Sequence, residues 1–163
     1  MATTPLDPAL SEQTRGILHA RPGQMDLDLD VTEGSIHHAR HLLVEGVRMW
    51  GLDDLAADFG LVVTELLTNT LQHARQPNGA PAERARCLVQ RIPTGLIAVV
   101  HDEDPTLPEE RITDADALDG RGLHIVRELA ACMAITPSPG GGKDITVILN
   151  VPPTSLAADG AAA

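Results

Sequence analysis

The amino-acid sequence predicts an α+β fold of two layers, in which helices cover one face of a mixed, largely antiparallel sheet. Two long stretches carry apolar residues at the helical period, whereas shorter apolar stretches have the length and alternation of strands. Along the chain these elements follow the order strand, helix, helix, strand, strand, loop, helix, strand. With 163 residues, 43% of them hydrophobic, the chain can bury one substantial core. Helices and strands therefore share that core as two packed layers.

We expect a single domain over residues 25–152. The first 24 residues mix proline, glycine, threonine and charge without a period, which is typical of a mostly disordered segment with a short helix at about Leu10–His19. Residues 153–163 form an alanine-rich tail that we also expect to be disordered.

The domain begins with a strand and a helix. Met25–Val31 alternates apolar and acidic residues, which predicts a half-buried edge strand. Thr32 then provides an N-cap for a helix that runs through Trp50 and is stopped by Gly51. Its apolar positions Ile36, Ala39, Leu43, Val47 and Trp50 recur at helical spacing, which predicts one apolar face.

A second helix begins at Asp53 or Asp54 and ends near Arg75, before a loop of turn-forming residues at 76–81. At about 100° per residue, its large apolar side chains share one face. These residues are Leu55, Phe59, Val62, Val63, Leu66 and Leu67. The helix is therefore amphipathic, with a strongly apolar face toward the core.

The second half of the chain supplies a hairpin and a long loop. Cys87–Ile92 and Leu96–Val100 have strand character, and Pro93–Gly95 provides the turn between them. Residues 101–120 are acidic, contain two prolines and lack a period, so we expect a loop there. Loops of this length in compact domains are usually functional or disordered.

A short glycine motif opens the third predicted helix. Residues 120–123 read Gly-Arg-Gly-Leu and precede a helical segment that we expect to end near Ala131. Glycines before a helix let an anion approach the backbone, where free N–H groups and the helix dipole favour phosphate. A simple transition from loop to helix explains the same residues equally well. A final strand, residues 144–151, follows a glycine-rich turn.

The strongest functional signal is a polar stripe on the second helix, made of Glu65, Asn69 and His73. Stepping by four, these residues cross the edge of the apolar face and move onto it. Polar groups directed at a core cost free energy unless they are paired or face a cleft, and a carboxylate one turn from an amide can orient water or a metal ion. The alternative is a solvated helix edge. Against it, the opposite face already has its own exposed set, which includes Thr64 and Arg75.

A second candidate is Asp102, which follows the apolar strand residues Val99 and Val100. A carboxylate just past the end of a strand lies where the mouth of a pocket would be. It can accept a hydrogen bond from an exocyclic amine such as that of adenine. Considered alone, a solvated acidic turn is the simpler interpretation of this segment.

Composition and charge disfavour several classes of function. The net charge of −11, with only one Phe, one Trp and no Tyr, argues against nucleic-acid binding, which needs basic patches or aromatic stacking platforms. No apolar window approaches the ~18 residues of a membrane span. No signal peptide is evident, so we expect a cytoplasmic protein. For Cys87 and Cys132, two reduced, packed thiols are then favoured over a disulfide.

The order and spacing of these motifs resemble the GHKL, or Bergerat-fold, superfamily of ATP-binding domains. Within it, the chain resembles the anti-sigma-factor serine kinases, and especially their single-domain actinobacterial relatives. Three stretches carry the narrower resemblance, namely residues 61–69, 102–108 and 120–126. The similarity spans roughly residues 25–152.

The resemblance implies a Mg-ATP site. Asn69 would ligate a Mg²⁺ ion that bridges the nucleotide phosphates, and Glu65 would be the catalytic carboxylate that polarises an attacking hydroxyl group or water. Asp102 would bind the adenine amine, and His73 would line the pocket beside Asn69. One Mg²⁺ ion and a helix N-terminus can neutralise phosphate without a basic surface.

The resemblance also implies a role for the glycine motif and for the long loop. Gly120, Gly122 and Leu123, with Arg121 between the two glycines, would place backbone N–H groups near the phosphates. Residues 103–119 would form the lid over ATP.

Two segments depart from the family pattern. Asp104 and Thr106 occupy positions that are often glycine in the adenine-binding motif. Lys143 and Asp144 stand where a threonine commonly meets the adenine site, so Thr146 is the candidate to replace it. These changes bear on the affinity for ATP and on the geometry of the lid.

The function implied by the resemblance is phosphoryl transfer from Mg-ATP to a Ser or Thr of a regulatory partner, such as the STAS-domain antagonists that anti-sigma-factor kinases phosphorylate. Two alternatives stay open. One is a nucleotide-gated module that sequesters a sigma factor or another regulator without catalysis. The other is a scaffold whose nucleotide site is degenerate. The family also suggests a homodimer.

Overall fold

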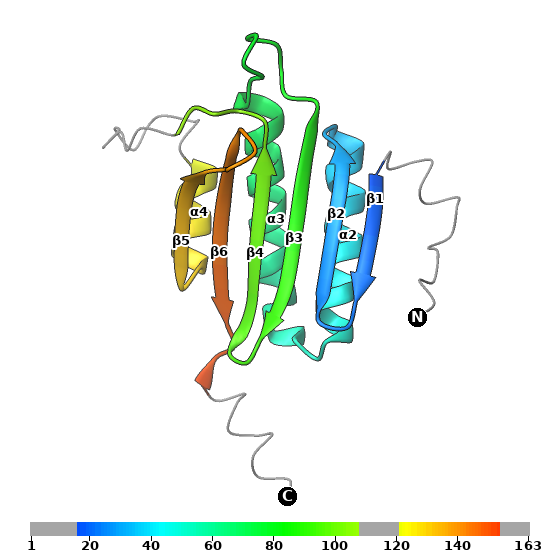
Figure 1. Cartoon of the computed structure of the whole chain (residues 1–163). Helices are drawn as coiled ribbons and strands as arrows, with labels where there is room; N and C mark the ends of the chain where they lie inside the picture. Colours follow the sequence, from blue (N-terminus) through cyan, green and yellow to red (C-terminus); the bar gives the residue numbers. More distant parts are fainter. Residues whose placement is uncertain (1–15, 108–120, 154–163) are drawn as a thin grey trace, which may run out of the picture.

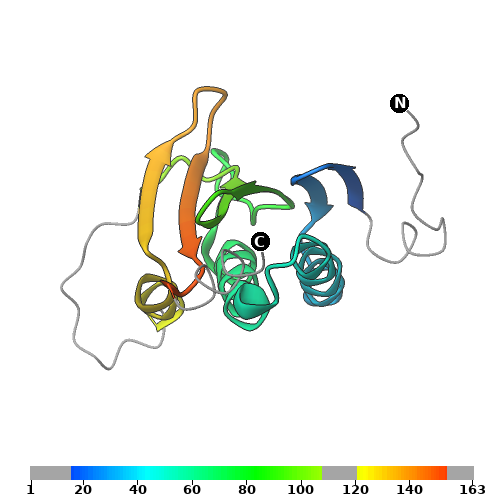
Figure 2. The same cartoon turned by 90° about the horizontal axis from the view of Figure 1, so that it is seen from below.

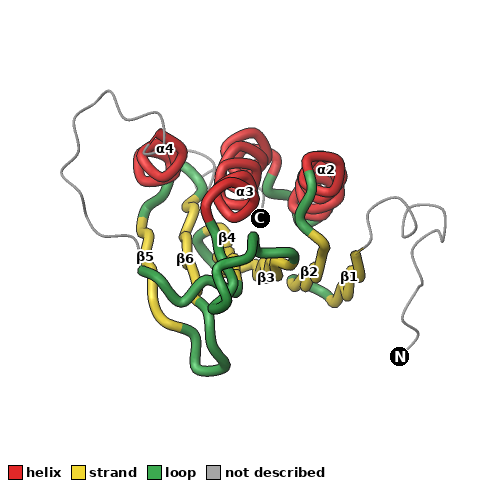
Figure 3. The backbone as a smooth tube through the Cα atoms, turned by 90° about the horizontal axis from the view of Figure 1, so that it is seen from above, coloured by secondary structure: helices red, strands yellow, loops and turns green. Residues whose placement is uncertain are grey.

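The computed structural model describes residues 16–107 and 121–153, which form two layers (Figure 1). One layer is a six-stranded sheet in the order β1-β2-β3-β4-β6-β5, and three helices cover one of its faces (Figure 3). The predicted α+β sandwich is confirmed. All five strand pairings are antiparallel, so the sheet that these residues form is not mixed.

The sheet has one covered face and one open face. Along β2, β4 and β6, buried residues alternate with less buried ones because successive side chains point to opposite faces. The buried set faces the helices, which is the usual arrangement of an antiparallel sheet that is covered on one side. The strands are Gly16–Arg21 (β1), Gln24–Asp30 (β2), Arg84–Ile92 (β3), Gly95–Asp102 (β4), Cys132–Pro137 (β5) and Lys143–Asn150 (β6).

The three helices are Glu33–Met49 (α2), Asp53–His73 (α3) and Arg121–Leu129 (α4). Helix α2 begins at the predicted N-cap. Ser35 N donates to Thr32 Oγ1 at 3.0 Å, and Thr32 N donates to Ser35 Oγ at 2.8 Å. This reciprocal pair satisfies two backbone N–H groups at the start of the helix. No helix in the described part of the chain is long and apolar enough to cross a membrane.

Helix α3 supplies the centre of the core. Five of its large side chains are fully buried, and burial of each contributes about 1.5–3 kcal/mol. They are Phe59, Val62, Val63, Leu66 and Leu67. This apolar face fixes the rotation of α3 about its axis, and the rotation in turn determines where the polar stripe at its edge lies.

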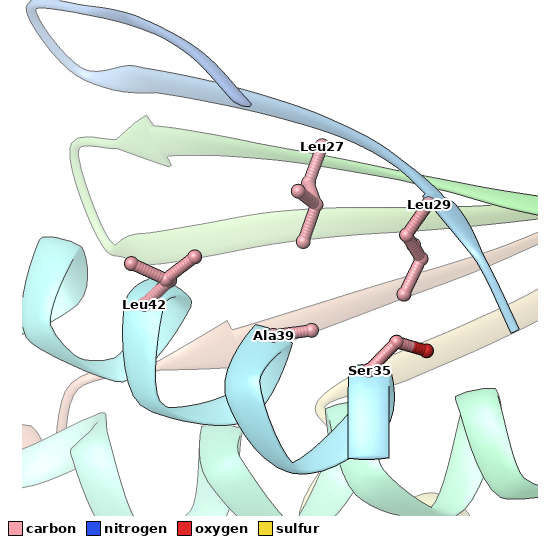
Figure 4. A pocket seen from close by; sticks show the side chains of 5 residues that line it. All are labelled: Leu27, Leu29, Ser35, Ala39 and Leu42. Carbon is pink, nitrogen blue, oxygen red and sulfur yellow. The ribbon is translucent and has the colours of Figure 1, made fainter. Parts of the chain in front are cut away.

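Helix α2 packs on β2 through small and apolar side chains. Figure 4 shows Leu27 and Leu29 of β2 pointing toward Ser35, Ala39 and Leu42 of α2. The space between them encloses no cavity that could hold a water molecule. This contact therefore supports the fold and offers no ligand site.

Strand β1 corrects the sequence prediction for the N-terminal segment. We expected residues 1–24 to be mostly disordered, with a short helix at about Leu10–His19, but residues 16–21 form an edge strand. Residues 1–15 lie outside the described residues. Because most residues of β1 are exposed, the strand needs no alternation of apolar residues, and its sequence has none. Its backbone pairing with β2 holds it in place. The segment Met25–Val31, predicted as an edge strand, accordingly lies inside the sheet.

Strand β5 was also missed, because it is a short edge strand whose residues are mostly exposed. Cys132 at its start is exposed, whereas Cys87 in β3 is fully buried. Both cysteines are free, so the prediction of reduced thiols agrees with the structure, but only Cys87 is packed. Burial raises the pKa of the Cys87 thiol to about 12.

Candidate functional site

Four elements meet at one end of the sandwich, at the top of Figure 1. Helix α3 and strand β4 end there, while helix α4 and strand β6 begin there. Helix α4 lies beside α3 on the covered side of the sheet, as the view from below shows (Figure 2). Motifs from distant parts of the sequence are thereby brought to one end of the molecule.

The polar stripe of α3 lies at the edge of the core, as predicted. Glu65 and Asn69 are half-buried, and His73, the last residue of the helix, is exposed. Within the described residues, the side chains of Glu65 and Asn69 have no hydrogen-bond partner. Two half-buried polar side chains, one helical turn apart, are therefore available to a ligand.

The start of α4 lies against Glu65. A β-carbon at Gly122 would be 2.7 Å from Glu65 Oε2, closer than such atoms approach in proteins. A glycine at this position therefore lets the first turn of α4 come this near to the carboxylate. The first N–H groups of a helix have no partner within it, and they attract anions. The structure thus brings the stripe of α3 and the second glycine of the motif together.

The remaining residues of the glycine motif are placed as follows. Arg121 is the first residue of α4, and Leu123 is half-buried and packs against the core. Gly120 and most of the proposed lid, residues 108–120, lie outside the described residues.

Asp102 is buried and paired, so it is not part of a solvated turn. It is the last residue of β4, and it is only 2% exposed. Its Oδ1 atom accepts hydrogen bonds from Asp104 N at 2.9 Å and from Lys143 Nζ at 3.0 Å. Its Oδ2 atom lies 3.4 Å from Thr70 Oγ1. Because Thr70 follows Asn69 on α3, this contact ties Asp102 to the helix that carries the stripe.

Thr146 does not join this group. On β6 the positions that face the helices are Lys143, Ile145, Val147 and Leu149, whereas Thr146 lies on the open face of the sheet. Lys143 takes the helix-facing position beside Asp102 instead. Gly142 makes this approach feasible, because its φ is +75° and a β-carbon there would overlap the carbonyl oxygen of Asp102.

Asp104, which replaces a family glycine, ties the end of α3 to the segment after β4. Its carboxylate accepts hydrogen bonds from Arg75 N at 2.9 Å and from Thr106 N at 2.8 Å. Burial disfavours the charged form, but the hydrogen bonds from Thr106 and Arg75 and the charge of Lys143 outweigh it, so the pKa of Asp104 is lowered. This substitution is therefore a structural contact in the present chain.

The sequence analysis did not identify Thr70 as a site residue, and it gave Lys143 no role in the site. Thr70 lies four residues after Leu66, on the apolar face of α3, and it is 1% exposed. A lone hydroxyl on an otherwise apolar face is a usable signal, since buried polar groups need partners. Lys143 was noted only as a departure from the family pattern, because its partner is 41 residues away in the sequence.

A groove of about 300 Å³ lies on the other face of the sheet. His101 Nδ1 and Asp144 Oδ1, which lie 2.7 Å apart at hydrogen-bond distance, form part of its wall. None of the residues predicted for the nucleotide site lines this groove. Its lining consists of Arg86, Leu88, Val99, His101, Ser138, Gly140, Gly141 and Asp144.

Comparison with known protein families finds a match to the histidine kinase-like ATPase domain over residues 17–149. This range contains the stripe, Asp102, the glycine motif and Lys143. No curated protein matches the chain. The family match supports ATP binding.

Proposed function

This chain belongs to the family of histidine kinase-like ATPase domains, and we propose that it is a protein kinase that transfers phosphate from Mg-ATP to a Ser or Thr of a regulatory partner. The resemblance to anti-sigma-factor kinases suggests a STAS-like antagonist as that partner. Kinase activity and this partner class go beyond the family match, which supports ATP binding.

One observation carries the proposal. The Glu65 carboxylate lies against the first turn of α4, and Asn69 follows one turn later on α3, with both side chains half-buried and unpaired among the described residues. Mg²⁺ in nucleotide sites is commonly held by one or two protein oxygen ligands together with the phosphates. The residues at this end, which we call the phosphate end (Glu65, Asn69 and Gly122), therefore fit a metal-bound phosphate.

Each residue of the phosphate end has a role in this proposal. The amide oxygen of Asn69 would hold Mg²⁺, which supplies charge neutralisation for the phosphates. Glu65 would orient the hydroxyl group of the partner and accept its proton as the phosphoryl group is transferred. Gly122 would let the phosphates approach the free N–H groups of α4.

Two non-catalytic functions rival the kinase, namely a nucleotide-gated module and a scaffold with a degenerate nucleotide site, and one observation favours the scaffold. Asp102, which the family resemblance assigns to the adenine amine, is already paired with Lys143. A base that requires the whole carboxylate would have to displace a buried ammonium group. Weak or absent nucleotide binding would follow from that competition.

The first test is calorimetric titration of the full chain with ATP in the presence and absence of Mg²⁺. Saturable, Mg-dependent binding to the wild type is expected, together with a roughly 100-fold loss, about 2.7 kcal/mol, in Asn69→Ala. Gln72→Ala is a matched control, because it removes an exposed amide from the same helix. No binding to the wild type at millimolar ATP would contradict the proposal and favour a scaffold.

The second test separates the kinase from the nucleotide-gated module. Transfer of labelled γ-phosphate to a STAS-domain partner is expected with the wild type and not with Glu65→Ala. Binding of ATP should persist in Glu65→Ala, because Asn69 and the base-binding residues remain. Regulation of the partner that survives in Glu65→Ala, with no phosphotransfer by either protein, would establish the non-catalytic module.

A further inference from the structure

A buried ion pair lies where the nucleotide base is expected. The two side chains of Asp102 and Lys143 are 2% and 6% exposed, and their charged atoms are 3.0 Å apart. Lys143 is the only lysine in the chain, which otherwise uses arginine for its cations. Burying a lysine requires compensation for its lost hydration. The position of this lysine is therefore a specific feature of the site.

The pair is held rigidly by the sheet. Asp102 and Lys143 are opposite each other in the register of β4 and β6. The carboxylate is fixed from a second side by Asp104 N, and the ammonium group also lies 3.4 Å from Asp104 O. We call Thr70, Asp102, Asp104 and Lys143 the base end of the site.

The number of hydrogen-bond donors and acceptors shows which of them Asp102 and Lys143 leave unused. An ionised carboxylate has about four acceptor sites and an ammonium group has three N–H donors. Asp102 Oδ1 accepts two hydrogen bonds, whereas Oδ2 has only the 3.4 Å contact with Thr70. Lys143 directs two donors, to Asp102 Oδ1 and Asp104 O. Within residues 16–107 and 121–153, one carboxylate acceptor and one ammonium donor of this pair therefore remain without a partner.

We propose that Lys143 and Asp102 together read the edge of the base, with Asp102 Oδ2 accepting the exocyclic amine of adenine and Lys143 Nζ donating to the adjacent ring nitrogen, N1. This inference rests on the proposed function, in that it places ATP in this site with its base at Asp102. Lys143 is thus a specificity-determining residue and does not compete with the nucleotide.

The pairing predicts which bases are rejected. Adenine presents an amine donor beside an unprotonated ring nitrogen, which matches the acceptor and the donor of the pair. Hypoxanthine presents a carbonyl oxygen beside a ring N–H, so in the same pose both contacts become mismatched. Sites that hydrogen-bond a ligand strongly reject analogues that leave their polar groups unpaired.

The decisive experiment compares ATP with 1-deaza-ATP, in which a C–H group replaces N1, on the wild-type chain. Loss of one charge-assisted hydrogen bond should weaken binding roughly 10- to 100-fold. The matched control is 7-deaza-ATP, which alters the opposite edge of the purine and should bind like ATP. Equal affinity for ATP and 1-deaza-ATP would overturn this inference.

A second measurement uses the single lysine. With ¹⁵N-lysine labelling, the chain gives one side-chain ammonium signal, which belongs to Lys143. ATP and 7-deaza-ATP should shift this signal in the same way, and saturating 1-deaza-ATP should not. An ammonium signal that responds identically to all three nucleotides would contradict direct contact with N1.

The variant Lys143→Met completes the test. It should bind ATP and 1-deaza-ATP equally, at about the affinity of the wild type for 1-deaza-ATP. Tighter binding of ATP by Lys143→Met than by the wild type would show that Lys143 obstructs the site, and would overturn the inference. If this variant does not fold, the comparison of ATP with 1-deaza-ATP binding to the wild-type chain still tests the inference.

These outcomes are distinguishable from failure of the proposed function. If neither ATP nor its analogues bind the wild type, the kinase proposal and this inference both fall. If ATP binds in a Mg-dependent manner and 1-deaza-ATP binds equally well, only the inference about Lys143 falls.

Discussion

The two ends of the candidate site differ in how their polar side chains are satisfied. At the base end, Asp102, Asp104 and Lys143 are buried and bonded to one another. At the phosphate end, Glu65 and Asn69 are half-buried and have no partners among the described residues. Helix α3 contributes to both ends, because Thr70 of the base end directly follows Asn69.

The two ends therefore contribute differently to the stability and to the function of the protein. Polar groups that are buried and paired stabilise the fold, and removing one partner exposes the other to the cost of unpaired burial. Unpaired polar groups at a boundary contribute little to the fold and remain available to a ligand. Substitutions at the base end should therefore affect stability as well as base recognition, whereas those at the phosphate end should affect function with little change in stability.

The largest expected effect on stability is that of Asp102→Ala. It leaves Lys143 buried without a counter-ion, and breaking a buried pair in this way costs about 3–5 kcal/mol. Chemical denaturation measures the loss. The double variant Asp102→Ala/Lys143→Met should recover most of it, since replacing a whole buried pair with apolar groups is often nearly neutral. If Asp102→Ala alone were as stable as the wild type, the paired side chains of the base end would not stabilise the fold, contrary to this expectation.

Asp104→Ala is expected to cost less, about 1–3 kcal/mol, because it leaves the backbone N–H groups of Arg75 and Thr106 without their acceptor. The effect should depend on pH. The pKa of Asp104 is lowered by folding, so its contribution is present above the unfolded value of about 3.9 and is lost as the pH falls through the folded value.

Unfolding free energies of the wild type and Asp104→Ala, measured from pH 7 down to pH 3, test this dependence. The two proteins should converge toward the acid end of the range. A gap that stays constant over the whole range would mean that the charge of Asp104 does not contribute.

Gly122→Ala tests the contact between the two helices at the phosphate end. The added methyl group would displace the Glu65 carboxylate, so phosphotransfer should fall by roughly tenfold, within the contribution of a positioned general base. Stability should change by less than about 1 kcal/mol, because alanine favours helix and the side chain of Glu65 can move. The control is Gly140→Ala, whose β-carbon would meet nothing within 4 Å.

The smallest expected effects on stability are those of Glu65→Ala and Asn69→Ala. Because these side chains have no partners among the described residues, each change should lie within about 0.5 kcal/mol of the wild type. Thermal unfolding checks this expectation beside the binding assays. A loss of 2 kcal/mol or more in either variant would show that the phosphate end also stabilises the fold.

Local sequence patterns were most informative where burial is periodic. The apolar residues of α3 predicted a helix, its buried face and the stripe at its edge, and the N-cap Thr32 predicted the start of α2. Strands β1 and β5 were missed because edge strands with mostly exposed residues lack that periodicity. Their formation depends on backbone pairing with β2 and β6, which local sequence does not encode.

The candidate site was predicted in part. The sequence and the family resemblance singled out Glu65, Asn69 and Asp102, and the structure brings Gly122 to Glu65 and Asp102 to α3. The side of the sheet on which Thr146 lies was not anticipated, because the resemblance did not fix the register of β6. A shift of one residue along a strand moves a side chain to the opposite face.

The local amino-acid pattern was enough to predict the two-layer fold and the position of the polar stripe, because the helical period fixes which residues of α3 share a face. The pairs of side chains that come into contact across the site could not be predicted in this way, because they depend on how the elements pack. Antiparallel pairing of β4 with β6 places Lys143 against Asp102, and packing of α4 on α3 places Gly122 against Glu65. Such contacts depend on strand register and helix packing between segments that are far apart in the chain.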